Sequence, residues 1–386
     1  PGCRIPDRGR RSAQPPFAWR GGCVVSAADL DVSIDLTTPR LRIDHRFTAG
    51  GTTAVVGPNG AGKSTMLRVL AGLLRGDDRS RIALGDRVFC DATTFVPPSR
   101  RGIALLSQDA RLFPHLTVAD NVAFAPAAQR LARSEVRARV ERWLAAAEVT
   151  DLADRKPHQL SGGQAQRGAL ARALAAQPRI LLLDEPFRAL DVDVASRLRA
   201  LLRTLLADRD RTTIMVTHDP VDALGLADDI LVLEDGRVVE SGSTRAVLAR
   251  PTSRFAASLS GLNLFVGRLD AGDAVVDPSG NRVVGGVEVD GPSSGAGAAA
   301  TFSPRAVAVY RKAPHGSPRT TLAATVRDVA PRGDHAVMTA EVGEQIVAAE
   351  VTWAAVADLG LVTGLAVYLV VKASEVRISG VGPGSL

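Results

Sequence analysis

Hydrophobic and polar residues alternate along two segments in the first part of the chain. The alternation runs from Asp29 to Leu36 and again from Leu41 to Phe47, and a period of two residues is typical of half-buried strands. A third strand is expected from Thr52 to Val56, where the chain runs straight into a glycine-rich loop. Two later apolar runs, Ile180 to Leu183 and Thr212 to Thr217, predict further strands.

Helical patterns separate these strands. The predicted helices are Ser64 to Leu70, Ser134 to Glu148, Gln164 to Ala176 and Val192 to Ala207. Strands that alternate with helices favour a mainly parallel sheet with helices on both faces. The first part of the chain is therefore expected to fold as an α/β domain.

The character of the chain changes beyond about Ser260. Gly, Val, Ala and Asp prevail there, and helical periodicity fades. The segment from Gly285 to Ala300 consists almost entirely of small residues, which predicts a flexible loop. From Thr321 to Ile378, short Val-rich runs are separated by Gly and Asp, which predicts a small all-β barrel.

The longest apolar run extends from Ala354 to Val371. It contains Asp358, Gly360 and Gly364, so we interpret it as strand, turn and strand rather than as a membrane helix. Any association with a membrane must then come through partner proteins.

Length and composition fit a folded protein with more than one domain. A chain of 386 residues suits one large domain and one smaller one, and 46% hydrophobic with 23% charged residues is a globular balance. The three cysteines, Cys3, Cys23 and Cys90, are far apart and form neither a metal-binding spacing nor a disulfide framework. This usage is typical of a reducing cytosol.

The formal charge of +6 comes largely from the N-terminus. Residues 1–23 hold five Arg and one acid, and removing them leaves 42 basic and 40 acidic residues. With only 4% aromatic residues and no basic stripe, no nucleic-acid partner is expected. The Arg-, Gly- and Pro-rich residues 1–24 begin with Pro1. We expect a disordered extension there, with translation starting near Val24 or Val25.

The sequence GPNGAGKST matches the phosphate-binding pattern G-x-x-x-x-G-K-[ST] and lies between a predicted strand and a predicted helix. Its glycines let backbone N–H groups surround a β-phosphate, and the helix N-terminus adds partial positive charge. The lysine is suited to bridge the β- and γ-phosphates, and the serine that follows it to ligate Mg²⁺. The candidate nucleotide contacts are Gly57, Pro58, Asn59, Gly60, Ala61, Gly62, Lys63, Ser64 and Thr65.

The sequence ILLLDEP, from Ile180 to Pro186, supplies two carboxylates at the end of a buried strand. Asp184 is placed to bind Mg²⁺, and Glu185 to accept a proton from an attacking water. An acidic strand cap is the bland alternative, and it is the weaker interpretation because the phosphate-binding loop is also present.

The sequence LSGGQ provides a second anion-binding helix N-terminus through Ser161, Gly162, Gly163 and Gln164. One chain cannot plausibly use both helix termini on one nucleotide. We therefore expect a head-to-tail homodimer in which each LSGGQ closes over the γ-phosphate held by the other chain.

These motifs resemble the ABC ATPase family over about Leu30 to Gly261. The resemblance implies a P-loop NTPase fold with ATP and Mg²⁺ as cofactors. It identifies Gln108, in LLSQDARLFPHLTV, as the Q-loop glutamine that contacts Mg²⁺ or water and senses transmembrane subunits. It also identifies Asp191, in ALD, as the D-loop aspartate and His218, in VTHD, as the switch histidine that contacts the γ-phosphate.

Two positions depart from the family pattern. The family often stacks an aromatic ring on adenine, but the region from Thr37 to Arg46 offers only Leu41 and His45. Arg188 stands where the D-loop usually carries a small residue. The first departure leaves the base-stacking residue open, and the second puts the detailed dimer contact there in question.

Two features are similar to bacterial import ATPases: LFPHLTVADNV, from Leu112 to Val122, and one ATPase domain followed by a small barrel. Exporters commonly fuse the ATPase domain to membrane helices. The stretch from Val96 to Val118 is similar to molybdate-transport ATPases. Residues Ser317 to Val326 and Val371 to Val376 resemble the start and end of the TOBE or Mop barrel. Molybdate is thus the implied substrate, and sulfate, ferric iron and polyamine importers are the alternatives.

The same resemblance suggests an oxyanion site in the barrel, formed by Ser317, Arg319, Lys372 and Ser374. Hydroxyls and cations suit a tetrahedral dianion. Thr320 stands where the family usually has Asn, and Pro318 where it has a small residue. The barrel could instead serve only to pack two ATPase subunits together.

Two other classes of function are less well supported. A non-transport ABC ATPase usually has a coiled-coil insertion or two ATPase domains, and neither is found here. A molybdate sensor with a degenerate ATPase does not fit the intact Lys63, Asp184, Glu185 and His218.

The predicted organisation follows from these motifs. The resemblance implies transmembrane permease subunits as partners, an extracytoplasmic substrate-binding protein acting indirectly, and a location at the cytoplasmic face of the cell membrane. The predicted parts are an extension (1–24), an ABC ATPase domain (25–261), a linker with the first strands of a regulatory region (262–316), and a TOBE/Mop-type, OB-like β-barrel (317–386).

Overall fold

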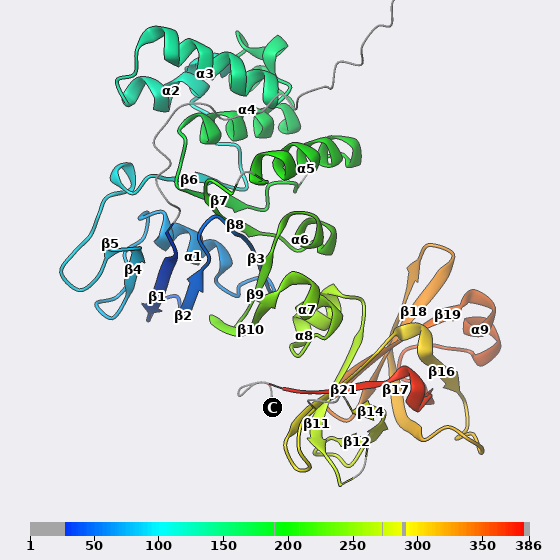
Figure 1. The fold of residues 1–386 in the computed structure, drawn as a ribbon. Coiled ribbons are helices and arrows are strands. Elements are labelled where there is room, and N and C mark those ends of the chain that lie inside the picture. Colours follow the sequence, from blue (N-terminus) through cyan, green and yellow to red (C-terminus); the bar gives the residue numbers. More distant parts are fainter. Residues whose placement is uncertain (1–27, 189, 208, 272, 288–290, 382–386) are drawn as a thin grey trace, which may run out of the picture.

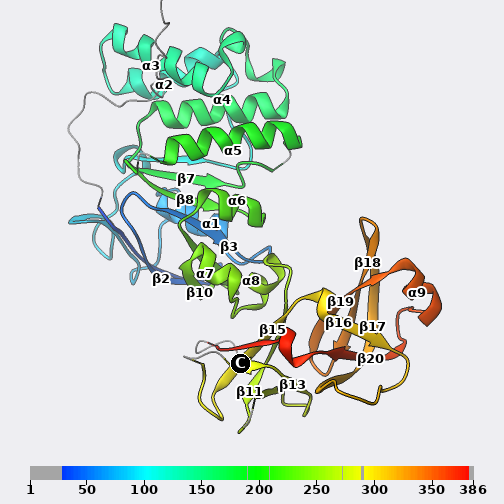
Figure 2. The same ribbon diagram turned by 45° about the vertical axis from the view of Figure 1, so that its right-hand side comes forward.

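The computed structural model describes residues 28–188, 190–207, 209–271, 273–287 and 291–381. They form an α/β part followed by a smaller part built of two sheets (Figures 1 and 2). The expectation for residues 1–24 lies outside the described residues. No helix in the described ranges is long and apolar enough to cross a membrane.

The α/β part contains one ten-stranded sheet in the order β5-β4-β1-β2-β10-β9-β3-β8-β7-β6. Strands β9, β3, β8, β7 and β6 are parallel, as predicted. Strands β1, β2, β4 and β5 form antiparallel pairs at the other end of the sheet. The strands are β1 (Leu30–Leu36), β2 (Leu41–Phe47), β3 (Thr52–Val56), β4 (Arg81–Leu84), β5 (Arg87–Cys90), β6 (Ile103–Leu106), β7 (Ile180–Asp184), β8 (Thr212–Val216), β9 (Asp229–Glu234) and β10 (Arg237–Ser243).

Helices cover both faces of the parallel strands, as predicted. Alternate residues of β7 explain why its sequence is apolar throughout: Ile180 and Leu182 join the core around α1, while Leu181 and Leu183 join the core under α2 to α5. Helices α2, α3 and α4 group together at one end of this part (Figure 1). The helices are α1 (Lys63–Leu70), α2 (Val118–Ala128), α3 (Arg133–Ala146), α4 (Gly162–Ala175), α5 (Val192–Leu206), α6 (Pro220–Leu226), α7 (Thr244–Ala249) and α8 (Arg254–Leu259).

The second part contains a six-stranded sheet, β13-β12-β11-β15-β21-β14, and a five-stranded sheet, β16-β20-β17-β18-β19, around one shared core. Its elements are β11 (Asn263–Leu269), β12 (Ala274–Val276), β13 (Arg282–Val284), β14 (Gly286–Val287), β15 (Gly297–Phe302), β16 (Val307–Tyr310), β17 (Thr320–Arg332), β18 (His335–Val342), β19 (Gln345–Thr352), α9 (Trp353–Leu359), β20 (Ala366–Val371) and β21 (Arg377–Gly380). The boundaries predicted at residues 261 and 316 stay predictions.

Two predictions for the second part were wrong. Residues 353–359 form helix α9 and not a strand, because the Thr352 hydroxyl caps its first turn and Gly360, at φ +60°, ends it. Residues 297–300 belong to strand β15 and not to a flexible loop. Their small side chains suit a strand that is buried between β11 and β21.

Two buried amides join the two sheets. Asn263 on β11 exchanges hydrogen bonds with the N–H and C=O of Ala348, at 2.7 and 2.8 Å. Gln345 on β19 does the same with Val266, at 2.7 and 3.0 Å. Each amide imitates a peptide group of a neighbouring strand, so the two sheets pack without leaving these backbone groups unpaired.

Candidate nucleotide site

The glycine-rich loop connects β3 to α1, as predicted, and its geometry requires glycine at two positions. A Cβ atom on Gly57, at φ +149°, would lie 2.0 Å from the Leu233 carbonyl oxygen. A Cβ atom on Gly62, at φ +97°, would lie 2.6 Å from Leu41 Cδ1. Leu41 is fully buried beneath the loop, so it supports the loop from below.

Lys63 is held by the loop that it follows. Its Nζ donates to the carbonyl oxygens of Gly57 at 2.7 Å and Pro58 at 2.8 Å. Burial lowers the pKa of Lys63, while the nearby carboxylates of Glu185 and Asp184 oppose that change. The ammonium group is therefore positioned at the loop before any phosphate is bound.

Ser64, in the first turn of α1, contacts Asp184, the last residue of β7. The Ser64 hydroxyl donates to Asp184 Oδ1 at 3.2 Å. Burial raises the pKa of Asp184, and the nearby Glu185 adds to the rise, while the Ser64 hydrogen bond and Lys63 oppose it. This hydroxyl and carboxylate are the hard oxygen donors that Mg²⁺ prefers beside phosphate oxygens. Among the residues described, no cluster of three or more His, Cys, Asp or Glu forms a separate metal site.

Glu185 lies next to Asp184 in a left-handed conformation, at φ +48°. Its side chain is 13% exposed, and its Oε1 lies 3.7 Å from Nδ1 of the exposed His218. Its Oε2 accepts from Arg188 Nη1 at 2.8 Å. With its amide oxygen facing Arg188, Gln108 accepts from the same Nη1 at 2.8 Å and from Nε at 3.3 Å. The fold thus brings Glu185, His218 and Gln108 together, with Arg188 between two of them.

The LSGGQ residues lie at the N-terminus of α4. Ser161 and Gln164 form a capping box, in which Ser161 Oγ accepts from Gln164 N at 3.3 Å and Gln164 Oε1 accepts from Ser161 N at 3.0 Å. Ser161 and Gly162 are exposed, and Gly163 faces Leu190. No hydrogen bond of the described residues joins this terminus to the loop at residues 57–65. Asp191 is exposed at the start of α5.

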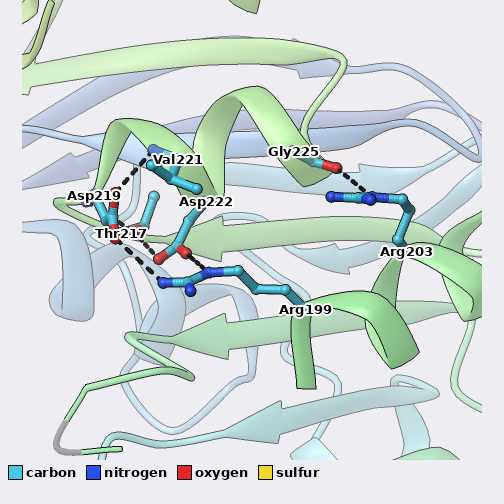
Figure 3. A network of polar contacts seen from close by, with 7 residues as sticks. All are labelled: Arg199, Arg203, Thr217, Asp219, Val221, Asp222 and Gly225. Atoms are coloured by element: carbon cyan, nitrogen blue, oxygen red, sulfur yellow. Dashed lines mark hydrogen bonds and ion pairs between the residues drawn. The ribbon is translucent and has the colours of Figure 1, made fainter. Parts of the chain in front are cut away.

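A polar network anchors the segment that carries His218, and our sequence reasoning missed it. Arg199 on α5 donates from Nε to Asp222 at 2.5 Å and from Nη2 to Asp219 at 3.2 Å (Figure 3). The Thr217 hydroxyl donates to Asp222 at 2.8 Å. Burial raises the pKa of Asp222, and the Arg199 and Thr217 hydrogen bonds oppose that rise. Arg199 also lies over the Phe187 ring, at 5.1 Å from its centroid.

Asn121 was missed as well. It is fully buried on α2, accepts from the Phe113 N–H at 2.8 Å, and donates to the carbonyl oxygens of Phe113 and Thr117. It therefore holds in place the segment that follows Gln108. The signal available in the sequence was one amide among the apolar residues of a helix.

The proposed oxyanion residues lie at one end of the five-stranded sheet. Thr320 on β17 pairs with Val371 on β20, so Arg319 and Lys372 extend from adjacent strand ends. Ser317, Arg319, Lys372 and Ser374 are all exposed. The buried Thr320 hydroxyl accepts from Val284 N at 2.9 Å and so serves the fold.

The phosphate-binding loop, the paired carboxylates and the LSGGQ helix define the ATP-binding subunit of an ABC transporter. The family model "ABC transporter" matches residues 41–188, and the model "TOBE domain" matches residues 316–378. The chain belongs to this ATP-binding family. It is 44% identical over 348 residues to the molybdenum import ATP-binding protein ModC of Mycobacterium tuberculosis. The aligned stretch covers 88% of this chain and 94% of that relative.

Other relatives match a shorter stretch. The sulfate/thiosulfate import ATP-binding protein CysA of Mycobacterium tuberculosis is 45% identical over 57% of this chain and 61% of its own length. Among solved structures, cbiO1 from Clostridium perfringens, part of the ABC transporter complex cbiONQ, has a TM-score of 0.52 at 28% identity. It covers 58% of this chain and 92% of that one. The ATP-binding cassette MJ0796, solved as a dimer with ADP and Pi, has a TM-score of 0.50 at 29% identity and covers 56% of this chain and 99% of that one.

Proposed function

We propose that this protein hydrolyses ATP to energise the import of molybdate through a separate transmembrane permease. One observation carries the choice of substrate: the similarity to the molybdenum import protein continues through the second part of the chain, over 94% of that relative. The sulfate/thiosulfate, spermidine/putrescine and Fe(3+) import relatives match 57–59% of this chain. These relatives are similar to this protein over a shorter stretch of the chain, so sulfate, ferric iron and polyamines are the alternative substrates.

The chemistry follows from the positions of the side chains around the loop. Lys63 neutralises charge on the β- and γ-phosphates, and the loop N–H groups hold them at the start of α1. Ser64, Asp184 and Gln108 would hold Mg²⁺, and the bound metal would neutralise charge on the transferred phosphoryl group. Glu185 orients the attacking water and accepts its proton, and His218 contacts the γ-phosphate.

A head-to-tail homodimer completes the site. At the capped N-terminus of α4, Ser161 and Gly162 are exposed and Gly163 and Gln164 are partly exposed, and no hydrogen bond among the described residues joins them to the loop of their own chain. This helix N-terminus is therefore free to meet the γ-phosphate of a partner, with Asp191 near the contact. The dimeric MJ0796 structure supports this arrangement. We place the dimer on permease subunits at the cytoplasmic face of the membrane, served indirectly by an extracytoplasmic binding protein.

The second part of the chain is proposed to bind the oxyanion. The side chains of Ser317, Arg319, Lys372 and Ser374 offer hydroxyl and cationic donors at one sheet end, which suits a tetrahedral dianion. The alternative is that the two sheets only hold ATPase subunits together.

Transport by the reconstituted complex tests the proposal. The full chain is assembled with its permease in proteoliposomes, ATP is enclosed on the side of the ATPase, and uptake of radiolabelled molybdate, sulfate, ferric iron and spermidine is compared. We expect ATP-dependent molybdate uptake that is lost in Glu185→Gln. Uptake of another of these substrates without molybdate would select that alternative, and an absence of ATP hydrolysis with the permease present would reject the proposed function.

A further inference from the structure

Arg188 joins two groups that the proposed reaction uses. One nitrogen, Nη1, donates to Glu185 Oε2 at 2.8 Å and to the facing amide oxygen of Gln108 at 2.8 Å. Glu185 and Gln108 come from different segments, one after β7 and the other after β6. The guanidinium group therefore holds the two segments together at the edge of the sheet.

This contact competes with the roles assigned to both partners. A carboxylate that accepts a proton from water has to direct an oxygen at that water, and here a cation holds one oxygen of Glu185 in another direction. The Gln108 amide oxygen, which would ligate a metal ion, faces the same guanidinium group. The positive charge at the Gln108 amide also opposes the binding of a metal ion there. The arrangement seen here is therefore suited to the nucleotide-free chain and not to the reacting one.

Release of Arg188 does not disturb the core. Its side chain is 54% exposed, whereas the preceding Phe187 is buried and stacked against Arg199. Phe187 thus keeps the backbone in place while the guanidinium group moves into solvent or toward phosphate oxygens. A triphosphate brings negative charge to the site, which offers Arg188 a competing partner.

We propose that Arg188 is a positioning residue that holds Glu185 and Gln108 in an inactive arrangement until MgATP binds, and so keeps the free subunit's ATPase rate low. The proposal rests on the function proposed above. It predicts that the contact is broken in the active dimer on the permease, where the rate is high.

The experiment compares Arg188→Ser, Arg188→Lys and the wild type as full chains. The control is Arg137→Ala, since Arg137 forms an equally short ion pair with Glu141 on the exposed face of α3. We measure kcat without permease, kcat with permease, and the Kd of ATP with and without Mg²⁺ by calorimetry. A purely structural role for Arg188 would change both rates in the same direction.

The expected result is a several-fold rise of the permease-free kcat in Arg188→Ser, with the permease-stimulated kcat unchanged, so that the stimulation ratio falls. Affinity for MgATP rises several-fold, while affinity for metal-free ATP does not. Arg188→Lys gives smaller changes, because one ammonium group cannot reproduce the planar fork. Arg137→Ala matches the wild type in each measurement.

A permease-free rate and an MgATP affinity in Arg188→Ser that equal or fall below those of the wild type would overturn the proposal. The two proposals fail separately. A wild type that does not hydrolyse ATP even on its permease rejects the proposed function, and the MgATP affinities then still decide whether Arg188 holds the two residues.

Discussion

Arg199 Nε lies 2.5 Å from Asp222 Oδ1, and this ion pair ties helix α5 to the segment that carries His218 (Figure 3). The Asp222 side chain is 5% exposed and the Arg199 side chain 22%. Helix α5 begins at the D-loop, so the pair connects two segments of the proposed site. The Coulombic attraction in a buried ion pair is largely offset by the cost of desolvating the two charges. The pair therefore fixes the relative position of the two segments more than it adds to stability.

Replacement of Arg199 by Ala is expected to be damaging. Among the described residues, it leaves the buried Asp222 carboxylate with the Thr217 hydroxyl alone, which should lower the free energy of unfolding by about 3 kcal/mol. Displacement of His218 should lower kcat by about tenfold or more. Urea unfolding and ATPase assays measure both effects.

Arg203→Ala is the matched control for this prediction. Arg203 lies four positions further along α5 and donates to the Gly225 carbonyl oxygen of the same helix α6, at 3.3 Å (Figure 3). It is exposed and faces no buried carboxylate, so its replacement should change either quantity little. Equal effects of the two variants would contradict the role given to Arg199.

Asp184→Asn should stabilise the nucleotide-free protein while abolishing Mg²⁺-dependent hydrolysis. Burial raises the pKa of Asp184 above that of an unfolded Asp, so its contribution to stability is present at low pH and is lost as pH rises through the folded-state pKa. The variant lacks this titration and should be more stable than the wild type near neutral pH. The difference should vanish in acid. Denaturant unfolding across pH measures this trend, and a difference independent of pH would refute it.

Glu185→Gln should separate binding from turnover. The amide keeps the size of the side chain but cannot accept the proton from water, so hydrolysis should fall by about a hundredfold or more while ATP binding is retained. Because bound ATP joins the two subunits, the variant should accumulate as a dimer in the presence of ATP. Size-exclusion chromatography with and without ATP detects this species, and an unchanged hydrolysis rate would remove Glu185 from its role.

Lys372→Ala should weaken oxyanion binding by the full chain. The exposed Lys372 lies beside Arg319 at the proposed site, and loss of one charge-assisted contact should cost about 1.5–3 kcal/mol of binding free energy. Calorimetry with molybdate, tungstate and sulfate provides the measurement. Lys312→Ala, which removes an equally exposed lysine outside the proposed set, is the control. If the wild type binds none of these anions, the second part of the chain has a structural role alone.

The chemistry of the nucleotide site could be predicted from the sequence because it is written in short contiguous stretches. The loop at residues 57–65 and the carboxylates at 184 and 185 depend on local backbone conformation and on the end of a strand, and both are properties of neighbouring residues. The apolar run of β7 likewise indicated a buried strand.

Contacts between distant segments were decided only by the tertiary structure. An arginine can reach many acids, so nothing in the order of residues shows that Arg188 meets both Glu185 and Gln108 or that Arg199 meets Asp222. The small side chains at residues 297–300 and the alanines of α9 are compatible with loop, strand or helix when considered alone. Packing between β11 and β21 selected a strand for residues 297–300, because burial acts only once the partner strands have come together. The caps of α9 at Thr352 and Gly360 are local signals that the sequence contains and that our sequence reasoning did not use.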